Sequence, residues 1–237
     1  MRLAFVALTI ASMLALLPVL AFAQNDQAFD VVKSKGTESF VFNYDAANHD
    51  SKNPLVYSFD GPKAPSWILT IHNNMSYVDR KDARTVIKIQ EPAPSEKFIE
   101  IIMYGGHDSN KYLVSVNTPE TGYQRMYDSD LGGWSADGPI SVGHDINQGL
   151  SVTDGKRIVI DRLDLQGFAI GSIAVYGNDG GDNSTQLANT DSGNISFELF
   201  YGNFQESQLY FVPAAVMVGV GGLVAGLLII KKRKPSD

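Results

Sequence analysis

Cysteine is absent from all 237 residues of the chain. Without disulfides, the fold must rest on a hydrophobic core. The absence of thiolates also excludes blue copper sites, iron–sulfur clusters, cysteine nucleophiles and covalent c-type haem. If the chain is exported, its lack of cysteine fits a prokaryotic cell surface better than an animal one.

Basic residues are scarce in the middle of the chain. Residues 24–211 contain 14 Lys and Arg against 25 Asp and Glu, which gives a net charge of −11. A segment with that charge repels both nucleic acid and anionic membrane surfaces. We therefore expect neither of them as its ligand.

Recognised catalytic motifs are absent as well. The sequence contains no Gly-x-Ser-x-Gly, no His-Glu-x-x-His and no phosphate-binding loop. The four histidines are scattered, and no two have the spacing of a metal site. Two of the many carboxylates could form a glycosidase pair, but an acidic exported domain carries as many for solubility. The sequence therefore predicts a protein that is not an enzyme.

Long apolar runs are confined to the two ends of the chain. In residues 1–23, Arg2 precedes an apolar run that ends in Ala21-Phe22-Ala23. This order is typical of a secretory signal peptide cleaved before Gln24. The alternative is an uncleaved N-terminal anchor, because the run approaches the length of a membrane span.

The second apolar run, residues 212–230, contains no charged residue. As a helix it would be about 28 Å long, close to the roughly 30 Å thickness of the hydrocarbon core. The basic residues of the 231–237 tail favour a cytoplasmic C-terminus. The run thus predicts a single-pass cell-membrane protein with residues 24–211 outside the cell. Gly222 and Gly226 form a GxxxG pair through which the helix could pack against a membrane partner.

Short segments with a period of two dominate residues 24–211. Residues 39–44, 66–72 and 84–90 alternate between two sets of side chains and are rich in β-branched and aromatic types. The same pattern covers 97–104, 111–116, 157–163, 168–176, 195–201 and 208–211. Loops rich in Gly, Asn and Pro separate them. This predicts one antiparallel β-sandwich of jelly-roll or immunoglobulin-like type, with Trp67 in its core. Two smaller sandwiches that meet at a seam near 118–122 are the alternative.

Two of these segments carry a resemblance to a known family. Residues 168–177, which end in Tyr176-Gly177, are followed by a loop rich in Asp and Gly and by the alternating strand 195–200. This arrangement resembles the closing strands of jelly-roll modules in secreted prokaryotic surface proteins. The resemblance implies a β-sandwich. Many such modules bind carbohydrate, but no binding residue can be carried over from core strands.

One acidic loop suggests calcium. Asp128 and Asp130 lie two residues apart ahead of Gly133, as at the start of a calcium loop, and Asp137 could complete the site. An EF-hand is excluded, because position 5 is glycine and position 12 is proline. The alternative is an ordinary Asp/Gly turn.

Aromatic residues near this loop suggest a ligand site. Trp134 stands in a Gly/Ser-rich loop, and Tyr123 and Tyr127 precede it. A loop tryptophan can present a flat face to a sugar or a protein, or can equally close one end of the sandwich. Asn74, Asn183 and Asn194 begin Asn-x-Ser/Thr sequons and are candidates for glycosylation.

Together these features predict a membrane-anchored cell-surface binding or adhesion module that recognises a glycan or a protein. An accessory subunit of a membrane complex, packed through Gly222 and Gly226, is the first alternative. A polysaccharide-active enzyme is the second.

Overall fold

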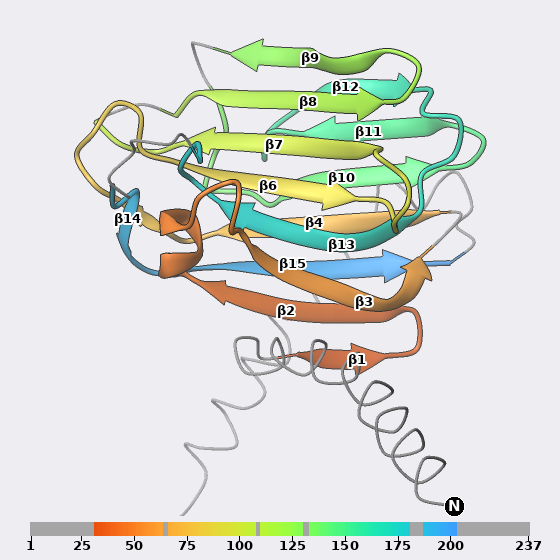
Figure 1. The fold of residues 1–237 in the computed structure, drawn as a ribbon, viewed down its shortest axis with the longest axis horizontal. Coiled ribbons are helices and arrows are strands. Elements are labelled where there is room, and N and C mark those ends of the chain that lie inside the picture. Colours follow the sequence, from red (N-terminus) through yellow and green to blue (C-terminus); the bar gives the residue numbers. More distant parts are fainter. Residues whose placement is uncertain (1–30, 64–65, 108–109, 130–132, 181–186, 203–237) are drawn as a thin grey trace, which may run out of the picture.

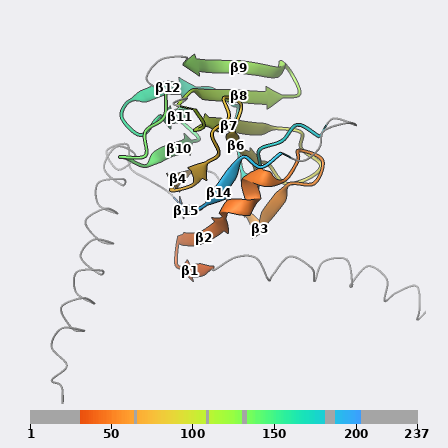
Figure 2. The same cartoon turned by 90° about the vertical axis from the view of Figure 1, so that its left-hand side faces the viewer.

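The computed structural model describes residues 31–63, 66–107, 110–129, 133–180 and 187–202. They form two antiparallel β-sheets that pack face to face in a jelly-roll-like sandwich (Figures 1 and 2). The predicted all-β antiparallel sandwich is confirmed. The predicted signal peptide, membrane helix and basic tail lie outside the described residues. Within the described part of the chain, no helix has the length and apolar character needed to cross a membrane.

The first sheet has seven strands in the order β1-β2-β15-β4-β10-β11-β12. In the middle of this sheet, strands that are far apart in the chain lie side by side, because β15 pairs with β2 on one side and with β4 on the other. The strands are β1 (Val32–Ser34), β2 (Thr37–Asn43), β15 (Asn194–Tyr201), β4 (Trp67–Asn73), β10 (Ile140–Asp145), β11 (Gly149–Thr153) and β12 (Ile158–Leu163).

The second sheet has six strands in the order β3-β13-β6-β7-β8-β9 and lies in front in Figure 1. Two short strands and one 3-10 helix, η1, lie at one end of the sandwich, which faces the viewer in Figure 2. The strands are β3 (Leu55–Lys63), β13 (Ile170–Tyr176), β6 (Arg84–Gln90), β7 (Phe98–Tyr104), β8 (Tyr112–Thr118) and β9 (Gly122–Ser129); the short elements are β5 (Ser76–Tyr77), β14 (Thr190–Ser192) and η1 (Tyr44–Asn48).

The core lies between the two sheets and is rich in aromatic rings. Phe40 of β2 stacks on Tyr57 of β3 and on Phe197 of β15, with ring centroids 4.0 and 5.1 Å apart. Trp67 is completely buried, as predicted, and its indole nitrogen donates a 2.9 Å hydrogen bond to the carbonyl oxygen of Phe168. Alternate residues of most other strands supply the rest of the core, which is the arrangement that the period of two requires, whereas β1 is exposed throughout.

The predicted seam at 118–122 is the turn between β8 and β9, which pair in the same sheet. Strands from both halves of the chain alternate in the seven-stranded sheet, where β4 lies between β10 and β15. The described residues of both halves therefore share one hydrophobic core.

Asp145, at the end of β10, makes stability depend on pH. Its carboxylate accepts hydrogen bonds from the Ser66 hydroxyl at 2.7 Å and from the backbone N–H of Asn147 at 2.9 Å. Burial raises the pKa of Asp145, but these bonds and one from the Gln148 backbone outweigh it, so the pKa lies below its usual value. A lowered folded-state pKa stabilises the fold above the unfolded-state pKa, about 4, and this contribution is lost as the pH falls through the folded-state value.

We expect Asp145→Asn to lower the free energy of unfolding by about 1–3 kcal/mol at pH 7, because hydrogen bonds to an ionised acceptor are lost. The difference between wild type and variant should be smaller at pH 3 than at pH 7, because pH 3 lies below the unfolded-state pKa and approaches the lowered folded-state pKa. Urea unfolding of the purified full-length proteins at both pH values measures it. An equal penalty at the two pH values would show that the charge of Asp145 is irrelevant.

Candidate functional site

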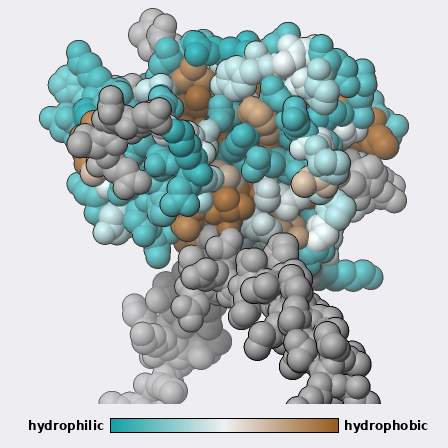
Figure 3. Space-filling model, viewed as in Figure 1, coloured by the Kyte–Doolittle hydropathy of each residue, from teal (hydrophilic) through white to brown (hydrophobic). Residues whose placement is uncertain are grey.

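The outer face of the six-stranded sheet carries a group of polar and aromatic side chains around Glu100. Ile99, Ile101 and Met103 of β7 point into the core, so Glu100 between them points outwards. The register places Glu100 opposite Lys88 of β6 and Ser115 of β8. Figure 3 shows this side of the molecule, where apolar patches lie among hydrophilic side chains.

Two tyrosines hold the Glu100 carboxylate. Its Oε1 accepts a hydrogen bond from the Tyr176 hydroxyl at 2.5 Å, and its Oε2 accepts one from the Tyr123 hydroxyl at 2.8 Å. Tyr176 lies on β13 and Tyr123 on β9, so each side chain reaches across one intervening strand to β7. Glu100 is consequently only 8% exposed, whereas Tyr123 is 52% exposed.

The two phenols remain protonated at neutral pH. Burial raises the pKa of Tyr176 and of Tyr123, and the neighbouring Glu100 carboxylate raises both further. Each hydroxyl is therefore a donor and Glu100 is the acceptor. A ligand hydroxyl that replaces one phenol would contact the carboxylate directly, which makes Glu100 available for proton transfer on an open face.

A hollow of about 350 Å³ opens beside this cluster. It is lined by Lys88, Gln90, Phe98, Asn117 and the loop residues 95–97. The Lys88 ammonium lies 3.9 Å from the centroid of the Phe98 ring. The Phe98 ring lies next to that of Tyr123, with centroids 6.1 Å apart. The hollow thus combines charge, amide groups and aromatic surface.

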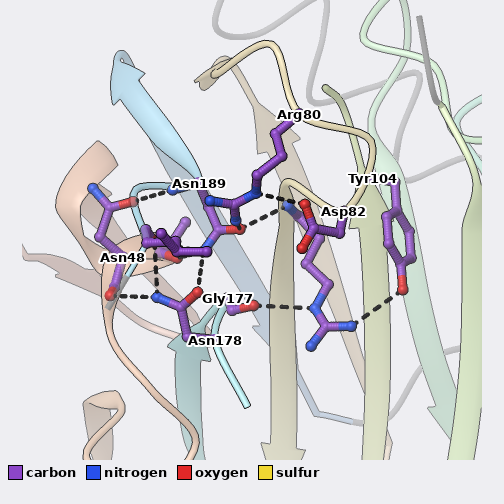
Figure 4. A network of polar contacts seen from close by, with 10 residues as sticks. Asn48, Arg80, Asp82, Tyr104, Gly177, Asn178 and Asn189 are labelled. Atoms are coloured by element: carbon purple, nitrogen blue, oxygen red, sulfur yellow. Dashed lines mark hydrogen bonds and ion pairs between the residues drawn. The ribbon is translucent and has the colours of Figure 1, made fainter. Parts of the chain in front are cut away.

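A polar network fixes the chain at the opposite end of the same sheet (Figure 4). Asn189 is at its centre: its Oδ1 accepts hydrogen bonds from the Arg80 guanidinium at 3.0 Å and from the Arg84 backbone N–H at 3.2 Å. Its Nδ2 donates to the carbonyl oxygen of Ala47 and to Oδ1 of Asn178, both at 2.9 Å. Asn189 is fully buried. It therefore joins η1, the start of β6 and the loop after β13.

Arg84 connects this network to the outer face. Its guanidinium donates hydrogen bonds to the carbonyl oxygen of Gly177 and to the hydroxyl of Tyr104, and pairs with Asp179 at 2.6 Å. At Gly177 a Cβ atom would lie 2.1 Å from the carbonyl oxygen of Ala47. Only glycine allows this close approach, so the turn glycine noted in the sequence has a steric reason.

The structure does not bring Trp134, Tyr123 and Tyr127 together. Trp134 is half-buried, packs near Tyr77 and donates a 2.6 Å hydrogen bond to the Tyr104 carbonyl oxygen. Tyr127 lies opposite Val114 on the core side, whereas Tyr123 is on the outer face. A β-bulge at Met126 causes this change of face. Ligand binding by these three residues stays a prediction.

Two of the three predicted calcium ligands are described, and neither is seen in a metal-ligand group. Asp128 pairs with Lys111 at 3.2 Å and with Arg125 at 2.8 Å. Asp137 is exposed, and Asp130 lies outside the described residues. Within the described ranges, no three acidic or histidine side chains are grouped as metal ligands. The calcium site stays a prediction.

Two of the three sequons are described. Asn74 and Asn194 are both exposed, and the Asn74 backbone N–H donates to the Asn194 carbonyl oxygen at 3.0 Å, so the two sites are neighbours. Asn183 lies outside the described residues, as do Gly222 and Gly226. Glycosylation and helix packing stay predictions.

The sequence reasoning missed Glu100, Tyr176 and Lys88. The signal for Glu100 was available, because a single carboxylate interrupts the apolar strand Phe98–Tyr104 at an outward position. Tyr176 lies 76 residues away in the chain, and only the strand order places it near Glu100.

The chain resembles several solved structures in fold. No protein-family model and no curated protein matches the chain. Among solved structures, a native glycosidic hydrolase has 12% identity and a TM-score of 0.44, covering 76% of this chain and 87% of that one. A prokaryotic β-1,3-1,4-glucanase from a mouse hindgut metagenome has 12% identity and a TM-score of 0.42, with coverages of 76% and 89%. A glycoside hydrolase family 16 endo-glucanase from Bacteroides ovatus has 10% identity and a TM-score of 0.40, with coverages of 73% and 85%.

These comparisons correct two predictions. The expected non-catalytic binding or adhesion module, and the expected lack of enzymatic activity, are contradicted, because the structures that match are those of hydrolases and glucanases. At these identities and TM-scores the likeness extends to the fold alone, so any reaction must be argued from the residues of the site.

Proposed function

We propose that the protein cleaves glycosidic bonds of a polysaccharide that lies across the outer face of the six-stranded sheet. The observation that carries this proposal is Glu100, a nearly buried carboxylate at the centre of an otherwise accessible face, held by two neutral phenols. A carboxyl group so placed can transfer a proton to or from the oxygen of a glycosidic bond.

The shape of the face suits a chain of sugars. From β13 to β9 it spans five strands, which is about 19 Å at the usual strand spacing. Tyr123 and Phe98 supply aromatic surface near the centre, and Gln90 and Asn117 supply amides beside it. Aromatic rings with polar neighbours suit sugars, which have both apolar ring faces and hydroxyl groups.

Hydrolysis requires a second carboxylate, about 5–10 Å from the first. Glu96 is the candidate among the residues that line the hollow, where it is exposed. Four residues of nearly extended chain separate it from Glu100, about 13 Å between Cα atoms, so the two side chains must lean towards each other over the bound sugar. A sugar hydroxyl that displaces the exposed Tyr123 side chain would bring the scissile bond to Glu100.

We expect Glu100→Gln to reduce cleavage at least about 100-fold, because the amide cannot transfer the proton. The test incubates purified full-length protein with neutral β-glucans and with polyuronates and measures new reducing ends. Glu198→Gln is the matched control, since Glu198 is half-buried on the outer face of the other sheet. Thermal unfolding shows whether both variants remain folded. Full activity in a folded Glu100→Gln protein, or no product from any polysaccharide with the wild type, would refute the proposal.

A further inference from the structure

Lys88 lines the hollow and lies opposite Glu100 in the register of β6 and β7, but it forms no ion pair with it. The Glu100 carboxylate instead accepts hydrogen bonds from two tyrosine hydroxyls. Lys33, Lys63 and Lys111 each lie within 4 Å of a carboxylate oxygen. Lys88, in contrast, has no hydrogen bond or ion pair with any residue that the structure describes, and its ammonium rests over the Phe98 ring. Lys88 is half-buried, so its positive charge is only partly screened by water.

Two other residues that line the hollow, Lys97 and Gln90, also carry hydrogen-bond donors that could bind an anion. The Lys97 ammonium donates to the carbonyl oxygens of Leu165 and Gly167 at 3.1 and 3.4 Å, and its electrostatic partner is the exposed Glu120 carboxylate. The Gln90 carboxamide lines the hollow and makes no hydrogen bond within the described ranges. Glu96 is the acidic residue of the lining, and it is exposed.

Ammonium and carboxamide N–H groups are the donors that a carboxylate accepts, and a charged donor strengthens each bond. The hollow, at about 350 Å³, lies at the small end of the usual range for ligand sites, roughly 300–1,000 Å³. It is therefore large enough for one sugar unit and lies beside the carboxylate that the proposed reaction uses.

We infer that this hollow binds the carboxylate of a uronic acid unit, so that the preferred polysaccharide is an acidic one. The inference rests on the proposed function for the position of the chain on the sheet. Lys88 and Gln90 contact the uronate carboxylate, and Lys97 adds positive potential. Lys88 is thus a specificity residue.

The test measures binding of a short oligouronate and of a neutral β-glucan oligosaccharide to the full-length protein by calorimetry. Lys88→Met keeps an unbranched side chain of similar length beside Phe98 and removes the charge. We expect it to weaken oligouronate binding at least about tenfold, as loss of a charged hydrogen bond implies, and to weaken binding of the neutral oligosaccharide by a clearly smaller factor, because only the uronate loses a charged partner. Lys35→Met, at the exposed turn between β1 and β2, removes the same charge elsewhere and should have no effect. Binding of the oligouronate should also weaken as salt increases.

The outcomes separate this inference from the proposed function. Equal oligouronate binding by wild type and Lys88→Met, or no oligouronate binding at all, overturns the inference. Cleavage of neutral glucan alone, with no effect of Lys88→Met, supports the proposed function and overturns the inference. Lys88-dependent oligouronate binding without any cleavage supports the inference and refutes the proposed function.

Discussion

Replacing Trp67 with alanine is expected to lower the free energy of unfolding by about 3–5 kcal/mol. Trp67 is completely buried between the sheets, with its ring next to those of His144 and Phe168 at centroid distances of 6.1 and 5.9 Å. Its removal leaves a large cavity. It also leaves the Phe168 carbonyl oxygen without the indole donor. Loss of packing and loss of a buried hydrogen bond therefore add together.

Trp67→Phe separates the two contributions. The smaller ring keeps part of the packing but cannot donate the hydrogen bond, so we expect an intermediate loss. Urea unfolding followed by far-ultraviolet circular dichroism measures all three proteins without relying on tryptophan fluorescence. A loss below about 1 kcal/mol in Trp67→Ala would show that the core can close around the missing ring.

Asn189→Ala is expected to cost about 3–5 kcal/mol, although it removes little apolar volume. The Asn189 side chain bonds to groups from three segments of the chain, namely Ala47, Arg80 with Arg84, and Asn178 (Figure 4). Because the site is buried, alanine leaves donors and acceptors without partners and without water. We further expect the loop after β13 to become more sensitive to proteases.

Two variants make this prediction specific. Asn147→Ala changes an exposed turn asparagine and should cost within about 0.5 kcal/mol, as surface changes usually do. Asn189→Asp keeps the acceptor for Arg80 and Arg84 but loses the donors to Ala47 and Asn178, so it should be intermediate. If Asn189→Ala and Asn147→Ala lowered the free energy of unfolding equally little, the hydrogen bonds of Asn189 would not stabilise the fold. Thermal unfolding compares the three variants.

The alternation of side chains predicted most of the sandwich. The expected segments 39–44, 66–72, 84–90 and 97–104 correspond to β2, β4, β6 and β7. β3 was missed because Gly61 and Pro62 were interpreted as a turn, whereas the structure accommodates them in an irregular pairing with β13. β9, β10 and β11 were missed as well, because Gly122, Pro139 and Gly149 stand at or just before their first residues and are typical of turns. The expected segment 208–211 lies outside the described residues. Turn residues inside an irregular strand give the same local signal as a true loop.

The candidate site was less predictable than the fold. Alternation alone places Glu100 on an outer face, but it does not show which strands lie two positions away. That information resides in the order β13-β6-β7-β8-β9, which is set by long-range packing. Similarly, the period of two would place Tyr123 and Tyr127 on one face, and the bulge at Met126 separates them. A bulge depends on both strands of a pair, so one strand's sequence does not reveal it.

The position of β15 has a mechanical consequence. This last strand of the described chain has seven residue pairs with β2 and seven with β4, and the chain leaves it at Gly202. A pull on residue 202 along the strand axis loads both ladders of hydrogen bonds in parallel, since these bonds lie across the direction of force. The strand must then slide past two neighbours at once instead of peeling from one edge. A tether attached at this end would hold the domain by its most firmly anchored strand.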